Sequence, residues 1–254
     1  MASKVSLTVY RGSPKTGAFV GAPFVVKLEA RLRFDNIPYK LGAGSPKTAP
    51  RGKIPYIEVG PTGEQLGDSA LIIRKLVDDG VMSDLNSRVP PLQRAHDLAI
   101  RALLEEKMYF YGVREKWCDN YTVMREGALA AIPWPIRWVV GLIASSNVTR
   151  TLYGQGTGRF TEDEVASWKE EVWESVAALL SDAKKASSAA QDPFWVLGGD
   201  SPTEADASLF GFVASALVCD AAPTTAKIVR SYPVVIDYAE RIHQKYFPDY
   251  EKWE

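Results

Sequence analysis

The pattern of apolar and polar residues in the first eighty positions predicts strands and helices in alternation. Residues 5–10 form a β-branched and aromatic run, typical of a short strand, and glycine, serine and proline follow it. Residues 23–36 carry apolar side chains at roughly helical spacing behind a proline, which favours a helix that begins there. A capped helix is expected after Asp68 and Ser69. Between these two helices we expect three further short strands, at residues 39–41, 56–59 and 64–66.

The strand pattern ends in a polar segment at residues 78–91, and we place a domain boundary there. Beyond it, apolar residues recur at helical spacing, first over residues 92–121, with Gly112 as a candidate interruption. Residues 161–164 and 203–206 each have the spacing of a capping box, a structural signal for a helix start. The sequence therefore predicts an α/β domain and an all-helical domain, at residues 1–82 and 90–254.

Composition and charge exclude several classes of protein. The 254 residues are 46% apolar and 24% charged, which excludes collagen, a coiled coil and wholesale disorder. Thirty Lys and Arg against 31 Asp and Glu leave a formal net charge of −1, so no overall positive field attracts nucleic acid or an anionic membrane surface. No apolar run reaches the roughly 18 residues that could span a bilayer, and we expect no membrane span.

The cysteines and histidines give information on the cellular compartment and on metal binding. Two cysteines are too few for a disulfide framework, and the chain starts without the apolar stretch of a signal peptide. Both observations favour a reducing, cytoplasmic location. His96 and His243 have no metal-ligand spacing around them, so no metal is expected.

Two motifs say more than the composition does. One joins Lys53-Ile-Pro-Tyr-Ile57 to Gly67-Asp-Ser-Ala-Leu71, and the other is Thr203-Glu-Ala-Asp-Ala-Ser-Leu-Phe210 in the helical part. Together they resemble the glutathione transferase superfamily, and the resemblance covers almost the whole chain. It implies a thioredoxin-like domain, a helical domain behind it, and a homodimer. Three short segments are similar to its failed-axon-connections branch, which is related to metaxins: residues 23–29, 153–159 and 241–249.

The resemblance implies a glutathione site in the first domain. Ile54, the residue before a cis Pro55, would pair through its backbone with the cysteinyl part of glutathione. Asp68 would take the γ-glutamyl ammonium group, and Ser69 with the helix start would take the carboxylate. Lys53 is close enough in sequence to help with the glycyl carboxylate. Each motif alone also has a structural interpretation, because Ile-Pro is common at strand starts and Asp-Ser is a common helix cap.

A group that stabilises the glutathione thiolate is harder to assign. Ala22 occupies the position at the helix start where related classes carry a catalytic cysteine or serine. The remaining candidates are Tyr10 at the end of the first strand, or Ser13 or Thr16 in the loop that follows. An ordinary thiol has a pKa of about 8.5, so one hydrogen bond to the sulfur could ionise it near neutral pH.

A substrate pocket is expected between the two domains, against the helix over residues 92–121. Tyr109, Tyr111 and Arg114 are its candidate residues, although aromatic side chains on a long helix are more often core or dimer contacts. The resemblance implies an enzyme that transfers the glutathione thiolate to a small, largely apolar electrophile, with glutathione as co-substrate. The alternative is a non-catalytic scaffold or ligand-binding protein of the same fold. Occlusion of the glutathione groove by residues 12–22 would favour that alternative.

Overall fold

The computed structural model describes residues 6–187 and 192–254, and begins with a four-stranded sheet. Its strands run in the order β2-β1-β3-β4, with β2 parallel to β1 and the other two pairs antiparallel. The predicted order of strands and helices is confirmed, although residue 5 of the first predicted strand lies outside the described residues. The strand bounds are β1 Ser6–Tyr10, β2 Tyr39–Gly42, β3 Tyr56–Gly60 and β4 Glu64–Gly67.

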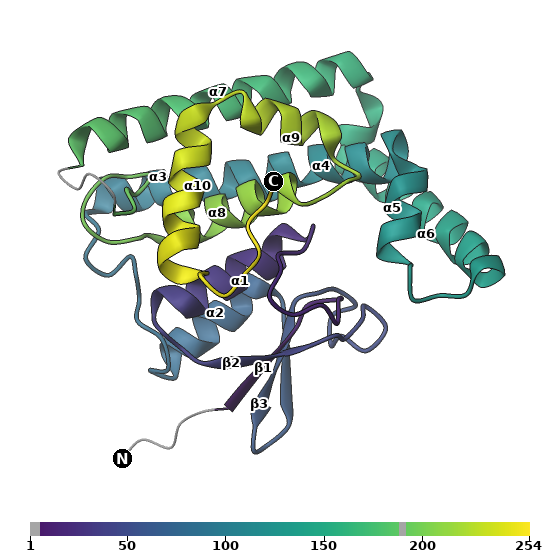
Figure 1. The fold of residues 1–254 in the computed structure, drawn as a ribbon, viewed down its shortest axis with the longest axis horizontal. Coiled ribbons are helices and arrows are strands. Elements are labelled where there is room, and N and C mark those ends of the chain that lie inside the picture. The colour runs from purple at the N-terminus through teal and green to yellow at the C-terminus, as the bar shows by residue number, and fades with distance from the viewer. Residues whose placement is uncertain (1–5, 188–191) are drawn as a thin grey trace.

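Two helices, α1 (Pro23–Phe34) and α2 (Ser69–Asp78), cover one face of this sheet (Figure 1). Leu7 and Val9 of β1 point into that layer and are buried with Leu28 of α1 and Ile72 of α2. Because side chains alternate along a strand, Thr8 and Tyr10 lie on the opposite face. The sheet therefore has one apolar face under helices and one face that carries polar side chains.

The rest of the described chain is helical, which confirms the predicted fold class. The helix is not interrupted at Gly112. It continues through α4, with π-helical turns on either side. These turns were not predicted, because the sequence pattern does not distinguish a π turn from an α turn. The bounds are α3 Pro91–Ala102, η1 Leu103–Met108, α4 Tyr109–Arg114, η2 Glu115–Asp119, α5 Tyr121–Ala128, α6 Trp134–Gln155, η3 Thr157–Arg159, α7 Glu162–Ala186, α8 Glu204–Leu217, α9 Pro223–Arg230 and α10 Pro233–Tyr246.

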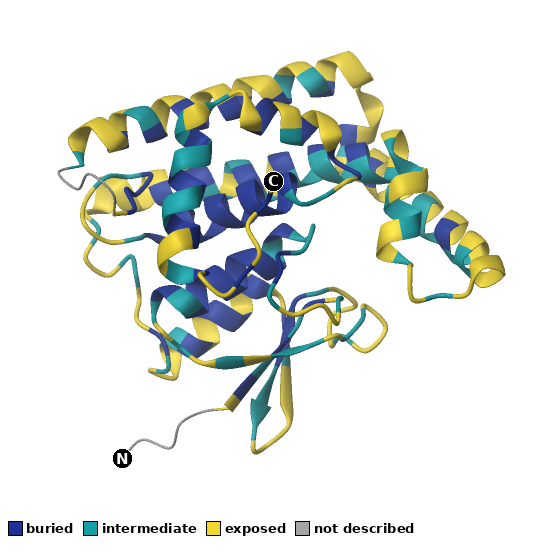
Figure 2. Cartoon of the chain, viewed as in Figure 1, coloured by how far each residue is buried: buried dark blue, intermediate teal, exposed yellow. Residues whose placement is uncertain are grey.

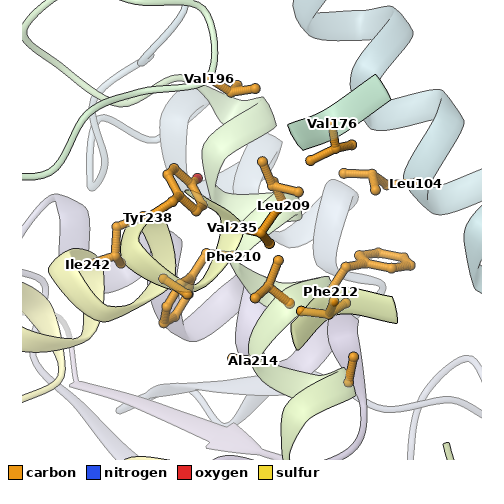
Figure 3. Packing of buried hydrophobic residues seen from close by; sticks show 14 of the residues in the cluster. Leu104, Val176, Val196, Leu209, Phe210, Phe212, Ala214, Val235, Tyr238 and Ile242 are labelled. Atoms are coloured by element: carbon orange, nitrogen blue, oxygen red, sulfur yellow. The ribbon is translucent and has the colours of Figure 1, made fainter. Parts of the chain in front are cut away.

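Helix α8 is the centre of the larger core and is buried along its whole length (Figure 2). Leu209 and Phe210 of α8 pack with Val176 of α7 and with Val235 and Tyr238 of α10 (Figure 3). The capping boxes predicted at Thr161 and Thr203 are both present, so local sequence fixes where α7 and α8 begin.

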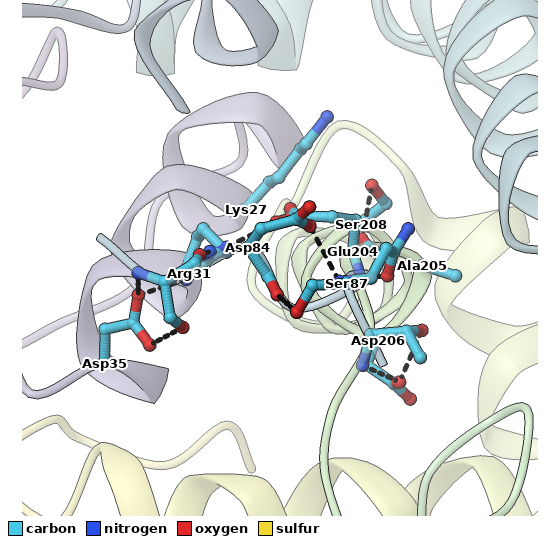
Figure 4. A network of polar contacts seen from close by, with 12 residues as sticks. Lys27, Arg31, Asp35, Asp84, Ser87, Glu204, Ala205, Asp206 and Ser208 are labelled. Atoms are coloured by element: carbon cyan, nitrogen blue, oxygen red, sulfur yellow. Dashed lines mark hydrogen bonds and ion pairs between the residues drawn. The ribbon is translucent and has the colours of Figure 1, made fainter. Parts of the chain in front are cut away.

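Helix α1 joins the sheet to the helical part by packing against α8. A Cβ on Gly211 would lie 2.7 Å from the Pro23 carbonyl oxygen, so glycine permits the close approach of the two helices. Ion pairs reinforce the contact: Arg31 Nε lies 2.6 Å from Glu204 Oε1 in the network of Figure 4. Lys27 Nζ lies 2.6 Å from Glu105 Oε1. The domain limits stay a prediction, and the two regions share this buried interface.

The C-terminal residues return to the loop after β1. The backbone N–H of Glu251 donates to the Gly17 carbonyl at 2.7 Å. Arg33 of α1 bonds both carboxylate oxygens of Asp249, at 2.5 and 2.8 Å. Phe19 in the loop packs with aromatic side chains that close this seam: Phe210, Phe247, Tyr250 and Trp253. Residues 12–22 therefore pack against the C-terminal segment through this hydrogen bond and these ring contacts.

Candidate functional site

The hairpin of β3 and β4 brings the predicted glutathione residues to one edge of the sheet. The first residue of β3 pairs with the last residue of β4 in antiparallel register. Residues 54–55 directly precede β3 and residues 68–69 directly follow β4, so both pairs adjoin the same end of the hairpin. The Ile54–Pro55 peptide bond is cis. The fold thus unites residues that lie thirteen or more positions apart in sequence.

Ile54 contributes backbone groups that could bind a peptide. Its N–H and C=O have no hydrogen-bond partner among the described residues. Its side chain faces the loop after β1, where a Cβ on Gly12 would lie 2.6 Å from Ile54 Cδ1. A free backbone donor and acceptor on one residue can pair with an extended peptide.

Asp68 contributes a carboxylate that is partly committed to the fold. As the N-cap of α2, its Oδ1 accepts hydrogen bonds from the backbone N–H of Ala70 at 3.0 Å and of Leu71 at 3.2 Å. Its φ of 79° lies in a region that costs about 1–3 kcal/mol for a residue with a side chain and that clusters at ligand sites. Oδ2 has no partner in the described part of the chain, and Ser69 is buried beside it.

Two exposed cations flank this corner, and neither has an acidic partner within residues 6–187 and 192–254. Lys53 was predicted for the glycyl carboxylate. Arg51 was not, because no spacing signal links it to the hairpin; its Cγ lies 3.3 Å from where a Cβ on Gly67 would be. Arg51 and Gly67 line a cavity of about 380 Å³, together with Pro50, Gln65, Leu66 and Leu71.

Tyr10 does not point toward this edge. Its ring stacks on that of Tyr56 with 4.5 Å between centroids, and its hydroxyl donates to Glu58 Oε2 at 3.3 Å. Since Glu58 lies two residues further along β3 than Tyr56, the phenol is directed back over the sheet, away from Pro55. Burial, and then the Glu58 carboxylate, raises the pKa of Tyr10, the reverse of what thiolate stabilisation favours.

The other two hydroxyl candidates also have different surroundings. The Ser13 hydroxyl oxygen accepts a hydrogen bond from the Lys15 backbone N–H at 3.2 Å. Thr16 is exposed and lines a separate cavity of about 370 Å³ with Arg33 and Asp249. At the start of α1, Ala22 is the N-cap and makes no side-chain cap. The three candidate hydroxyls thus have three different surroundings, and their predicted roles stay predictions.

The three predicted substrate residues line three different cavities. Tyr109 lines a cavity of about 40 Å³ at the start of α1, with Pro23 and Phe212. Tyr111 lines one of about 610 Å³, and Arg114 one of about 180 Å³. Only the first lies between α1 and the helical part, where the substrate pocket was expected. Small-molecule sites usually measure about 300–1,000 Å³, and this space is far below that range.

Residues distant in sequence complete the surroundings of the α1 start. Lys116 donates to the Gly21 carbonyl oxygen at 2.8 Å. A Cβ on Gly21 would lie 3.0 Å from Cys219 Sγ, so this free cysteine stands beside the segment that precedes Ala22. Sequence analysis missed both contacts because they join residues about one hundred and two hundred positions apart. Groups of three or more metal-binding side chains are absent from the described residues.

Comparison with known proteins gives three findings. A model of the glutathione S-transferase N-terminal domain matches residues 23–122. Metaxin-2 from mouse is 25% identical over 233 residues, which cover 89% of this chain and 82% of the relative. Human Metaxin-2 is 25% identical over 230 residues, 87% of this chain and 81% of the relative.

Solved structures of glutathione S-transferases have a similar fold. A glutathione S-transferase III in its apo form superposes with a TM-score of 0.54 at 16% identity, covering 97% of this chain and 95% of the other. A rice glutathione S-transferase in complex with glutathione gives a TM-score of 0.56 at 14% identity, covering 99% and 92%. The chain is thus similar to the glutathione transferase superfamily in its fold and in the family model that matches residues 23–122. Along most of its length it is also similar to the metaxins, so the resemblance noted in the sequence is confirmed.

This similarity accounts for the architecture of the corner, whereas the chemistry of the corner depends on the residues of this chain. At 14–16% identity the solved transferases establish the fold alone. The roles predicted for Lys53, Ile54, Asp68 and Ser69 stay predictions, as do those for Tyr10, Ser13 and Thr16. A fold can keep a groove while the reaction changes or is lost.

Proposed function

We propose that this protein binds glutathione at the corner of Ile54, Asp68 and Ser69, and holds it without activating its sulfur through a side-chain hydroxyl. The observation that carries the proposal is the unpaired backbone of Ile54 at the same sheet edge as the exposed Asp68 carboxylate. This proposal combines parts of the two functions predicted from the sequence, the glutathione transferase and the non-catalytic binding protein. It keeps the glutathione ligand of the first and the non-catalytic role of the second.

The chemistry of the ligand matches the corner group by group. The cysteinyl amide and carbonyl pair with the free N–H and C=O of Ile54. The γ-glutamyl ammonium meets Asp68 Oδ2, which is free because only Oδ1 caps the helix. Glutathione also carries two carboxylates, and the unpaired cations Arg51 and Lys53 stand at this edge to receive them.

Two features argue against rapid conjugation. The Tyr10 hydroxyl is bonded to Glu58 and so does not donate to a bound sulfur; without a donor, a thiol keeps its ordinary pKa of about 8.5 and is only a few per cent ionised at pH 7. The cavity at the start of α1 holds about 40 Å³, which leaves no room to orient an electrophile beside the sulfur. Positioning is the larger source of acceleration in such reactions, so its loss matters more than the missing hydroxyl.

The test is calorimetric titration with glutathione and with S-methylglutathione between pH 7 and pH 9. We expect both ligands to bind, with affinities that agree within about threefold and a ratio that stays constant as the free thiol ionises with a pKa of about 8.5. A site that stabilises thiolate would favour glutathione over its methylated form, increasingly so at higher pH. That outcome would restore the transferase function, whereas binding of neither ligand would remove glutathione altogether.

A conjugation assay separates the two functions directly. With 1-chloro-2,4-dinitrobenzene as the electrophile, we expect no rate above the uncatalysed reaction, for the wild type and for Tyr10→Phe alike. A catalysed rate that falls in Tyr10→Phe would contradict our assignment of this side chain. The expected homodimer and the cytoplasmic location stay predictions, and sedimentation velocity with fractionation of cells would test them.

A further inference from the structure

The first half of α6 exposes a large apolar surface. Helices α5 and α6 extend away from the body of the molecule, and little of α6 is buried (Figures 1 and 2). Trp134 is 70% exposed and Trp138 is 50% exposed. Other exposed apolar side chains of this half-helix are Ile136, Val139, Leu142 and Ile143.

This surface is unusual for a helix in contact with water. Residues 134–143 contain a single charged side chain, Arg137, and apolar residues occur on the solvent side as well as the inner side. Helices that are apolar all round are normally buried, and contiguous apolar patches on soluble proteins usually mark a site of interaction. The half-helix therefore needs a covering partner.

The charges around the patch indicate which partner it fits. From residue 127 to residue 161 the chain has three arginines and no aspartate or glutamate. Arg137 at the patch bonds Glu126, with 2.5 Å between Nη1 and Oε2. Arg150, two turns beyond the patch, is exposed and has no partner in the described part of the chain. Arg150 and Arg159, which have no acidic partner in the described residues, thus give a chain of net charge −1 a local positive charge on the segment that carries the apolar patch.

We propose that the first half of α6, with the α5–α6 turn, inserts into the interfacial layer of a lipid bilayer that carries anionic headgroups. Tryptophan rings favour that layer because they are apolar with one polar N–H, and arginine binds lipid phosphate. The second half of α6 exposes Ser146, Asn147 and Arg150, which suits headgroup contact rather than deeper insertion. In the described residues no helix meets the length and hydropathy that crossing a membrane requires.

A second copy of the chain fits the same surface less well. In a two-fold contact the same patch meets itself, so the exposed, unpaired Arg150 side chains of both copies would lie at one interface. Glu126, the acidic residue at the patch, already pairs with Arg125 and Arg137, and residues 127–161 supply no further acidic side chain to compensate Arg150. The membrane proposal is independent of glutathione binding, since α6 lies in the helical part, far in sequence from the sheet edge.

Co-sedimentation with lipid vesicles tests the proposal. We expect the wild type to bind vesicles of phosphatidylcholine with phosphatidylglycerol, to bind pure phosphatidylcholine weakly, and to dissociate in high salt. The double variant Trp134→Ala with Trp138→Ala should bind about tenfold or more weakly to both kinds of vesicle. Arg150→Glu should weaken binding about tenfold to the anionic vesicles alone.

Matched controls separate insertion from unfolding and from nonspecific adhesion. Leu92→Ala with Leu98→Ala removes two exposed apolar side chains of α3, 70% and 59% exposed, and should leave vesicle binding unchanged. Both double variants should keep the wild-type melting temperature, because the deleted rings and side chains are exposed. Vesicle binding unaffected by the tryptophan substitutions would overturn the proposal. The proposal would also be overturned if the wild type does not bind vesicles and instead self-associates in sedimentation velocity through the same two tryptophans.

Discussion

At the scale of single residues, Asp68 shows how one side chain can serve the fold and a ligand together. One carboxylate oxygen caps α2, which explains why an acid can remain at a φ of 79° that glycine would adopt more easily. The other oxygen stays exposed at the sheet edge. Its two functions can be separated, because asparagine caps a helix about as well as aspartate but carries no charge.

Replacement of Asp68 by asparagine and by alanine should therefore have different results. We expect Asp68→Asn to change the free energy of unfolding by less than about 0.5 kcal/mol, and Asp68→Ala to lower it by about 1 kcal/mol. Both should bind glutathione about tenfold more weakly, because the charge-assisted bond to the ammonium is lost. Urea denaturation and calorimetry measure the two effects. Glu64→Gln, at the far end of the same hairpin, is the control; equal binding by Asp68→Asn and wild type would place the ammonium elsewhere.

At the scale of elements, the contact of α1 with α8 holds the sheet to the helical part. Gly211 is the point of closest approach: a Cβ there would lie 2.7 Å from the Pro23 carbonyl oxygen and 2.8 Å from the Lys27 nitrogen. Both atoms belong to the backbone, so the clash cannot be relieved by turning a side chain. Separation of the helices would also strain the ion pair of Arg31 with Glu204.

Gly211→Ala should destabilise the protein although alanine is the better helix former. We expect the overpacking to cost about 1–3 kcal/mol of the free energy of unfolding. Gly112→Ala in α4 is the matched control, since nothing lies within 4 Å of its added Cβ, and it should stabilise by up to about 1 kcal/mol. Urea denaturation of both variants provides the measurement. Gains of similar size in the two would show that α1 can move away from α8 freely.

The same scale shows which parts of the structure are readable from sequence. The strands, the helix starts at Pro23 and Asp68 and the two capping boxes follow from local patterns, and the structure confirms them. Helix α9 was missed because a distant residue stabilises its start. The carboxylate of Glu115 in η2 accepts from the backbone N–H groups of Thr224 and Thr225 at 2.8 and 3.1 Å.

Some features of the candidate site could likewise be predicted from sequence, and others could not. The position of the corner could be predicted, because the hairpin pairs Tyr56 with Gly67 and so brings residues 54–55 and 68–69 to the same end of the sheet. The direction of the Tyr10 phenol could not, since it depends on a stack with Tyr56 and a bond to Glu58. Sequence also could not predict that three different cavities contain Tyr109, Tyr111 and Arg114, because the packing of the helices determines which cavity each residue lines.

At the scale of the whole molecule, a buried charge network ties the end of β1 to α1 and to the C-terminal segment. Arg11 Nε lies 3.4 Å from Glu29 Oε1, and both side chains are fully buried. The Tyr250 hydroxyl donates to Glu29 Oε2 at 3.3 Å. Burial raises the pKa of Glu29 from 4.5 to about 7, and the nearby Arg11 and Arg33 only partly offset it.

This raised pKa gives stability a definite pH dependence. Between pH 4.5 and 7 the folded protein holds the Glu29 proton while the unfolded chain has released it, so this group makes stability fall as pH rises. Over the full window the loss amounts to about 3 kcal/mol. Glu29→Gln resembles the protonated form at every pH, so its stability relative to the wild type should increase steadily across the same window.

Urea denaturation of the wild type and of Glu29→Gln, at intervals from pH 4.5 to 7.5, tests this dependence. Taking the difference between the two proteins cancels other titrating groups, including Asp206, whose pKa burial raises to about 6. Glu251→Gln is the control, because that carboxylate is exposed and pairs only with the exposed Lys15 and should leave the profile unchanged. A difference that stays flat with pH would mean that Glu29 remains ionised throughout, with Arg11 compensating its burial completely.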